Sequence, residues 1–143
     1  MTRPLIMVID ESVLILDFMQ VLLNSEGYAV IGCYPGATNT AYIRHLCPNL
    51  LIVEIQRQNL DHITAFIQEI RADPITSDLP MLVMSTDSEL LTRIDLFLQQ
   101  HTCIAVEKPF EPDRLLKTMH QLITTPVTRE QYEQLANENR SLA

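Results

Sequence analysis

Hydrophobic positions along the chain alternate between short continuous runs and longer stretches with helical spacing. The short runs lie at residues 5–10, 28–34, 50–55, 81–85 and 103–107 and are rich in Leu, Ile, Val and Met. Such runs are typical of parallel strands that are covered on both faces. The stretches between them predict amphipathic helices. Five alternations predict an α/β fold, a parallel sheet with right-handed crossovers and helices on both faces.

Several residues predict where the helices begin and end. Ser12 is placed to cap the first helix, and Gly27 suits the left-handed conformation that follows a helix end. The second helix is expected to stop before Pro48. The stretch "SELLTRIDLFLQQ", residues 88–100, predicts one continuous helix.

The C-terminal part of the chain has a different pattern. We expect one domain over residues 4–124 and a C-terminal helical extension or linker over 125–143. Thr128 and Gln131 have the spacing of a capping box. Apolar and polar residues then recur at intervals of three and four, at Tyr132, Leu135, Asn139 and Leu142. About two heptads are too short to stand alone, so the helix would lie on the domain, fray in solvent, form a dimer or serve as a linker.

Composition and charge narrow the classes of function. The 143 residues include 10 basic and 18 acidic side chains, a net charge of −8 that does not favour direct binding to nucleic acid. Apolar runs fall short of the ~18 residues of a membrane span, and the N-terminus lacks a signal-peptide pattern. We therefore expect a soluble, cytoplasmic protein. Cys33, Cys47 and Cys103 are read as reduced core thiols, and the histidines show no metal-ligand spacing.

Charged and hydroxyl side chains follow four of the predicted strands. In chain order they are Asp10-Glu11, Glu54, Ser85-Thr86 and Glu107-Lys108-Pro109. The carboxyl ends of parallel strands meet at one edge of the sheet, where functional groups gather. Neighbouring carboxylates would repel, and either a hard divalent cation such as Mg²⁺ or the Lys108 ammonium would relieve that repulsion. The set predicts a functional site.

Four of these segments resemble the receiver domain of bacterial response regulators. They are "VIDES", "PNLLIVEI", "LPMLVMST" and "VEKPF", and the resemblance extends from residue 4 to about 124. It implies a flavodoxin-like (βα)5 doubly wound sheet with strand order 2-1-3-4-5, to which the C-terminal helix would be an addition. It also implies a role in two-component signal transduction.

The resemblance implies a role for each strand-end residue. The Mg²⁺ ligands would be Asp10, Glu11 and the backbone carbonyl of Gln56, with Glu54 as a further candidate. The switch and phosphate-contacting positions would be Ser85, Thr86, Ala105, Lys108 and Pro109. Glu54 would stand at the phospho-acceptor position.

The chain departs from the family pattern where phosphate chemistry takes place. The acceptor position holds Glu54 instead of Asp, and the following loop "QRQNLDH" lacks the usual Pro and Gly. Thr86 replaces a small residue that leaves room for phosphate, and Ala105 replaces the aromatic switch residue. Glu is one methylene longer than Asp, so its oxygen would miss the attacking point by roughly 1 Å.

Three functions follow as hypotheses. The first is a non-enzymatic pseudo-receiver, in which Glu54 pairs with Lys108 or partly mimics a phosphoryl group. The second keeps phosphotransfer, through Glu54 or the nearby Asp61. The third is a metal-dependent phosphohydrolase with Asp10 as nucleophile, although Ser12 breaks the usual D-x-D pattern.

The expected partners are proteins: a histidine kinase or a downstream effector. The resemblance points to the face of the fourth helix, fifth strand and fifth helix, which includes Leu91, Ile94, Ala105 and Arg114. A homodimer would form through this face or through the C-terminal helix. Neither nucleic acid nor a membrane is expected as a partner.

Overall fold

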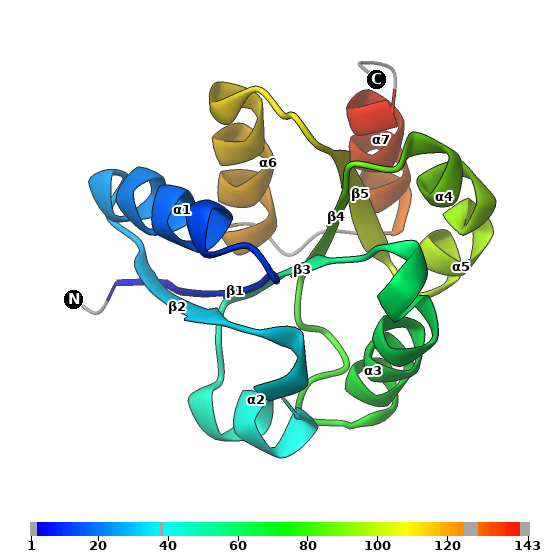
Figure 1. Cartoon of the computed structure of the whole chain (residues 1–143), viewed down its shortest axis with the longest axis horizontal. Helices are drawn as coiled ribbons and strands as arrows, with labels where there is room; N and C mark the ends of the chain where they lie inside the picture. The colour runs from blue at the N-terminus through cyan, green and yellow to red at the C-terminus, as the bar shows by residue number, and fades with distance from the viewer. Residues whose placement is uncertain (1–2, 38, 125–128, 141–143) are drawn as a thin grey trace.

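The computed structural model describes residues 3–37, 39–124 and 129–140, and its centre is a five-stranded parallel sheet (Figure 1). The strands are β1 (Leu5–Ile9), β2 (Ala29–Cys33), β3 (Leu50–Glu54), β4 (Met81–Ser85) and β5 (Cys103–Glu107). They lie in the order β2-β1-β3-β4-β5, and every neighbouring pair is parallel. The α/β class and the strand order 2-1-3-4-5 are thereby confirmed.

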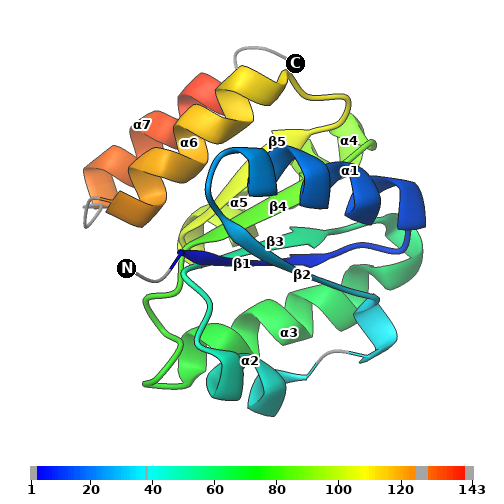
Figure 2. The same cartoon turned by 90° about the vertical axis from the view of Figure 1, so that its left-hand side faces the viewer.

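Helices connect the strands and cover both faces of the sheet. They are α1 (Val13–Ser25), α2 (Thr40–Leu46), α3 (Leu60–Ala72), α4 (Ser88–Arg93), α5 (Asp95–Gln100), α6 (Pro112–Thr124) and α7 (Arg129–Arg140), with short 3-10 turns η1 (Pro35–Ala37) and η2 (Arg57–Asn59). Figure 2 shows α1, α6 and α7 on one side of the sheet and α2 and α3 on the other. Among the described residues, no helix has the length and apolar character needed to cross a membrane.

Alternate residues of each strand supply two separate cores. On β3, Leu51 and Val53 join the core under α2, α3, α4 and α5. Leu50 and Ile52 join the core under α1, α6 and α7. All five residues of this central strand are buried, including Glu54 at its end. The fold therefore delivers a carboxylate to the buried edge of the sheet.

Most helix boundaries agree with the sequence, and one does not. The Ser12 side chain accepts a hydrogen bond from Ile15 N at 3.3 Å, and Gly27 has a φ of +90°, so both predictions are confirmed. The predicted continuous helix over 88–100 is wrong, because it divides into α4 and α5 at Ile94. There ψ is 10°, and the Ile94 N–H still bonds to the Leu90 carbonyl. The fifth helix of the prediction is α6.

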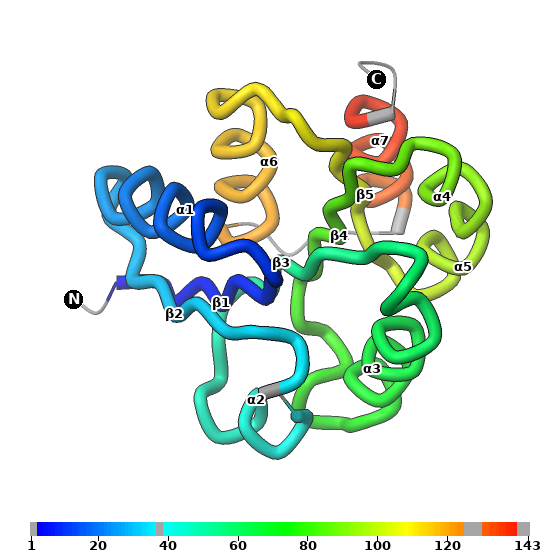
Figure 3. The backbone as a smooth tube through the Cα atoms, in the orientation of Figure 1, coloured from blue at the N-terminus to red at the C-terminus, as the bar shows by residue number. Residues whose placement is uncertain are grey.

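The C-terminal helix α7 lies along β5 (Figure 3), and its Asn139 donates a hydrogen bond to Thr118 of α6. Leu135 and Ala136 are buried in the core beneath α6, and Tyr132 packs against it. The interpretation of a helix lying on the domain therefore describes this structure. Thr128 and Leu142, which completed the predicted cap and spacing, lie outside the described residues.

Candidate functional site

The carboxyl ends of the strands bring four predicted site residues to one buried edge. Asp10 follows β1, Glu54 ends β3, Ser85 ends β4 and Lys108 follows β5. Their exposed fractions are only 2%, 4%, 0% and 7%. β4 pairs with β3 on one side and with β5 on the other, which fixes Ser85 opposite Glu107. The structure thus places these four residues at the same edge of the sheet.

Lys108 joins the two buried carboxylates. Its Nζ lies 2.6 Å from Asp10 Oδ2 and 2.5 Å from Glu54 Oε2. Buried charges remain stable only when they are paired and hydrogen-bonded. The backbone N–H of Lys108 donates to the Ser85 carbonyl at 2.8 Å, which holds the start of this loop against β4. The Lys108–Pro109 peptide bond that follows is cis.

Asp10 also orients the first helix. Its Oδ1 accepts a hydrogen bond from Ser12 N at 2.8 Å, while its Oδ2 accepts from Lys108. Ser12 is the residue that caps α1. Both oxygens of the Asp10 carboxylate therefore have donors, one from the backbone and one from the ammonium.

An ion pair that the sequence did not reveal joins the loops after β3 and β4. Arg57 Nε lies 2.7 Å from Asp87 Oδ2, and Asp87 Oδ1 accepts from Leu90 N at the start of α4. The hydrogen bond from Arg57 is the main reason that the pKa of Asp87 is lowered. Asp87 N in turn donates to the hydroxyl of Ser85 at 3.1 Å. Their separation of 30 residues left no local sequence signal for this contact.

Other predicted site residues do not join the buried cluster. Glu11, Thr86, Pro109 and the alternative acceptor Asp61 are exposed. Ala105 packs instead against the core on the side of α4 and α5. Of the proposed interaction face, Leu91 and Ile94 are buried in that core.

The two buried carboxylates among the candidate Mg²⁺ ligands are held by Lys108 in this structure. The Lys108 ammonium contacts both Asp10 and Glu54, so each of these carboxylates already has a cationic partner. Glu11 is exposed, and the Gln56 carbonyl accepts a hydrogen bond from Asn59 N. Across the described residues, no three His, Cys, Asp or Glu side chains form a group that could hold a metal ion.

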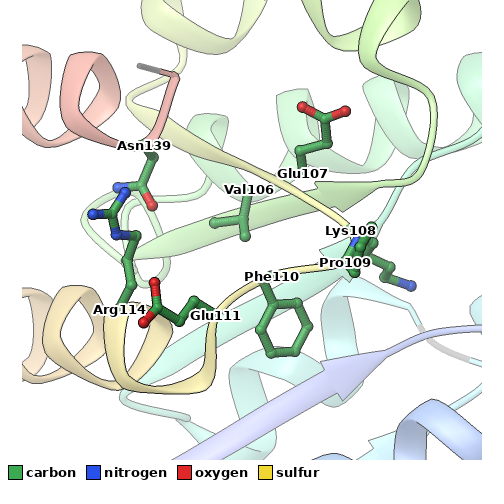
Figure 4. Close-up of a pocket in the computed structure, with 8 residues that line it drawn as sticks. All are labelled: Val106, Glu107, Lys108, Pro109, Phe110, Glu111, Arg114 and Asn139. Atoms are coloured by element: carbon green, nitrogen blue, oxygen red, sulfur yellow. The ribbon is translucent and has the colours of Figure 1, made fainter. Parts of the chain in front are cut away.

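A cavity adjoins the loop that carries Lys108. It has a volume of about 370 Å³ and lies between the end of β5, the start of α6 and the end of α7 (Figure 4). Val106, Phe110, Arg114 and Asn139 are among its lining residues. The Phe110 ring also contacts Phe18 of α1, with ring centroids 6.2 Å apart.

Two curated transcriptional regulators are similar to this chain in sequence. Curated relatives include the DNA-binding dual master transcriptional regulator RpaA of Synechocystis, 26% identical over 84% of this chain and 49% of that protein. The transcriptional regulatory protein ZraR of Salmonella typhimurium is 28% identical over 82% of this chain and 26% of that protein. The chain thus spans about half of one relative and a quarter of the other.

Solved structures show the same fold. The chemotaxis response regulator CheY4 of Vibrio cholerae superimposes with a TM-score of 0.70 at 21% identity, over 85% of this chain and 99% of that one. The family model of the response regulator receiver domain matches residues 6–120. This chain therefore belongs to the response regulator receiver domain family of two-component signalling.

Proposed function

We propose that this receiver domain is a pseudo-receiver: it transmits signals through protein contacts without phosphorylation of Glu54. The observation that carries the proposal is the 2.5 Å contact between Glu54 Oε2 and Lys108 Nζ inside a buried cluster. The Lys108 ammonium, which would stabilise the negative charge of a phosphoryl group, is already paired with Glu54.

The geometry of phosphoryl transfer supports this reading. Catalysis of that reaction depends on positioning and charge neutralisation, and a misplacement of about 1 Å can cost ~10²-fold in rate. The Glu54 carboxylate lies one methylene farther from the backbone than that of the usual Asp acceptor. It accepts a hydrogen bond from Lys108 Nζ. To attack a phosphorus atom in line, the Glu54 carboxylate would have to give up its contact with this buried ammonium, which would keep Asp10 as its partner.

Glu54 is also a poor permanent substitute for a phosphoryl group. A carboxylate carries one negative charge, whereas a phosphoryl group carries about −1.5 to −2 and three acceptor oxygens. The aromatic switch position is Ala105, which has no ring to reorient. We therefore propose a domain that holds one conformation and presents a constant surface.

The alternative chemistries have weaker support. Asp61 is exposed on the first turn of α3, whereas Asp10, Glu54 and Lys108 are buried. A phosphohydrolase would need Asp10 as nucleophile, but both of its oxygens accept hydrogen bonds from Lys108 and Ser12. We accordingly propose that the chain is not an enzyme.

Incubation with a small phosphodonor and Mg²⁺, followed by intact mass measurement, tests the proposal. We expect no phosphoryl adduct on the natural chain or on the Glu54→Gln control. A Glu54→Asp variant restores the shorter acceptor and is expected to gain an adduct. A stable adduct on Glu54 would contradict the proposal, and one on Asp61 would favour the alternative acceptor.

The partner we propose is a protein, either a kinase or a downstream effector. RpaA is named as DNA-binding, but this chain spans 49% of it and carries a net charge of −8, which does not favour contact with phosphates. A cytoplasmic location is part of the proposal, because Cys33, Cys47 and Cys103 are all free thiols, as suits a reducing compartment.

A further inference from the structure

The two edges of the sheet differ in what covers them. The helix α7 lies along β5, so that edge is covered by the chain itself. The opposite edge strand is β2, and among the described residues no strand lies on its outer side. Figure 2 looks onto this side of the molecule, where β2 passes in front of the sheet with α1 above it and α2 below. We define the β2 edge as the outer side of residues 29–33.

The backbone groups of β2 turn alternately toward β1 and toward this outer side. The Ala29 N–H donates to the Pro4 carbonyl at 2.9 Å, so Ala29 and every second residue after it face β1. The N–H and C=O groups of Val30 and Gly32 therefore face outward. Gly32 is exposed and has no side chain, so the surface that it exposes is backbone. Within the described residues these outward groups have no hydrogen-bond partner.

The β2 edge lacks the features that usually protect an open edge. Native edge strands are shielded by charged side chains, by proline or by a bulge. The sequence of β2 is AVIGC, which contains neither a charged residue nor proline, and its pairing with β1 has no bulge. A larger residue at position 32 would crowd the first helix, because a Cβ on Gly32 would lie 3.2 Å from Leu16 Cδ2. The strand is thus suited to pair with another strand.

The sequence of β2 is complementary to itself in the antiparallel direction. A two-fold axis through Ile31 places Val30 of each copy opposite Gly32 of the other. Each of these pairs exchanges two N–H···O=C hydrogen bonds, which gives every outward group a partner. The remaining pairs are alanine with cysteine and isoleucine with isoleucine, so no like charges face each other, although the net charge of each chain is −8. These matches favour a second copy of the chain as the occupant.

We propose that the β2 edge is an interface between two copies of this chain, whose β2 strands pair antiparallel about a two-fold axis at Ile31 and join the two sheets into one. The half-buried Ile31 side chains meet at the axis. The inference goes beyond the proposed function, because the pairing uses none of the buried residues Asp10, Glu54 and Lys108.

The first experiment measures the mass of the full chain by sedimentation equilibrium at increasing concentration. We expect the natural chain to form dimers reversibly. In Ile31→Lys or Ile31→Glu two like charges meet at the axis, so the dissociation constant of the dimer should rise about tenfold or more. An equal mixture of the two variants brings opposite charges together and should restore the dimer. The uncharged control Ile31→Val should dimerise nearly as the natural chain does.

Three results would overturn the proposal. They are a natural chain that stays monomeric, charged variants that dimerise as well as Ile31→Val, and a mixture that recovers no dimer. Circular dichroism establishes whether each variant is folded. If a charged variant does not fold, Val30→Pro takes its place, because proline removes an outward N–H and leaves the bonds to β1 in place. This variant should be monomeric, and a stable Val30→Pro dimer would equally overturn the interface.

The second experiment tests the register of the two strands. Ala29→Cys places a thiol opposite Cys33 of the second copy, in a non-hydrogen-bonded pair whose Cα atoms are about 4.5 Å apart, within the range of a disulfide. Within one strand the same two positions are about 13 Å apart, so a disulfide between them must join two copies. We expect oxidised glutathione to give a covalent dimer in which peptide mass spectrometry finds this link.

Ser25→Cys is the matched control, because it adds a thiol at an exposed position outside the proposed pair. It should form no link to Cys33. Absence of the link in Ale29→Cys, or an equal yield of links to Cys33 in the control, would overturn the proposed register. Neither experiment contains a phosphodonor, so an adduct on Glu54 would overturn the pseudo-receiver proposal and leave these results as they stand.

Discussion

Lys108 is the shared cationic partner of two buried carboxylates, Asp10 and Glu54. We predict that Lys108→Met lowers the free energy of unfolding by about 3–5 kcal/mol, because both carboxylates lose their shared partner. Urea denaturation measures this loss. The control Lys117→Met removes an exposed lysine of α6 and should cost no more than about 0.5 kcal/mol. Similar free energies of unfolding for the two variants would show that Lys108 does not stabilise the two buried carboxylates.

The same cluster predicts how the protein responds to Mg²⁺. In the natural chain Lys108 already contacts both Asp10 and Glu54, so millimolar Mg²⁺ should not raise the Tm. In Lys108→Met the two carboxylates are left for a cation, and Mg²⁺ should raise the Tm, since a ligand that binds only the folded state stabilises it. Thermal unfolding with and without Mg²⁺ checks both expectations. A clear rise in the natural chain would mean that a divalent cation displaces or joins Lys108.

The cysteines are expected to differ in reactivity because they differ in burial. Burial raises the pKa of the Cys103 thiol to about 11, so at pH 8 it holds very little of the reactive thiolate. Cys47 is exposed. Under native conditions at pH 8, we predict that a thiol reagent labels Cys47 and leaves Cys103 unlabelled, as peptide mass spectrometry would reveal. Denaturation should make both reactive, whereas equal labelling in the native protein would contradict the buried position of Cys103.

At the scale of elements, Arg71 connects α3 to two loops. Its guanidinium donates four hydrogen bonds to backbone carbonyls, those of Ser77, Leu79, His101 and Thr102. We predict that Arg71→Ala lowers the free energy of unfolding by about 2–4 kcal/mol, because several partly buried carbonyls lose their donors.

The conservative variant Arg71→Lys is the control for this prediction. A compact ammonium cannot span carbonyls from two loops as the planar guanidinium does, so Lys should recover less than half of the loss. Chemical denaturation of the three proteins gives the comparison. If Lys recovered the full free energy of unfolding, the positive charge at this position would matter and the planar set of guanidinium donors would not.

The elements that the sequence predicted are those with local signals. Apolar runs located all five strands, and Ser12 and Gly27 marked the ends of α1. The strand ends correctly grouped Asp10, Glu54 and Lys108, because parallel strands must meet at one edge. The pairing of Glu54 with Lys108 was one of two options that the sequence left open.

Contacts between distant side chains and backbone groups had no such signals. The carbonyl partners of Arg71 depend on loop conformations, which residue types alone do not specify. The position of α7 was equally open, because Leu135 and Tyr132 give an apolar face but do not say which surface it covers. The division at Ile94 arises from one ψ angle within a continuous helical pattern. Such features depend on tertiary contacts that overrule local preference.

At the scale of the whole molecule, the candidate site and the contact between β5 and α7 share the loop that follows β5. Lys108 follows directly after β5, and its backbone N–H bonds to the Ser85 carbonyl. The cavity beside it is lined by Val106 of β5 and by Asn139 of α7. A change in the pairing of Lys108 is therefore expected to reach the contact between β5 and α7 through the backbone of this loop.

We predict that Glu54→Gln loosens α7 as well as the site. Glutamine keeps the length of Glu54 but removes its charge, so Lys108 keeps Asp10 as its only anionic partner in the described cluster. The loop that bears Lys108 is then held less firmly, and hydrogen exchange over residues 103–107 and 129–140 should rise about fivefold or more, the lower end of typical coupling between sites. Residues 60–72 of α3 lie away from this route and should exchange as before.

Asp61→Asn supplies the matched control, because it removes the same charge from an exposed position on α3. Hydrogen exchange followed by mass spectrometry compares the two variants with the natural chain. Glu54→Gln could change hydrogen exchange near residues 50–55 and leave α7 as protected as in Asp61→Asn. In that case the buried cluster and the contact of α7 with β5 are independent. A joint increase would instead mean that the charge at Glu54 helps to keep α7 on β5.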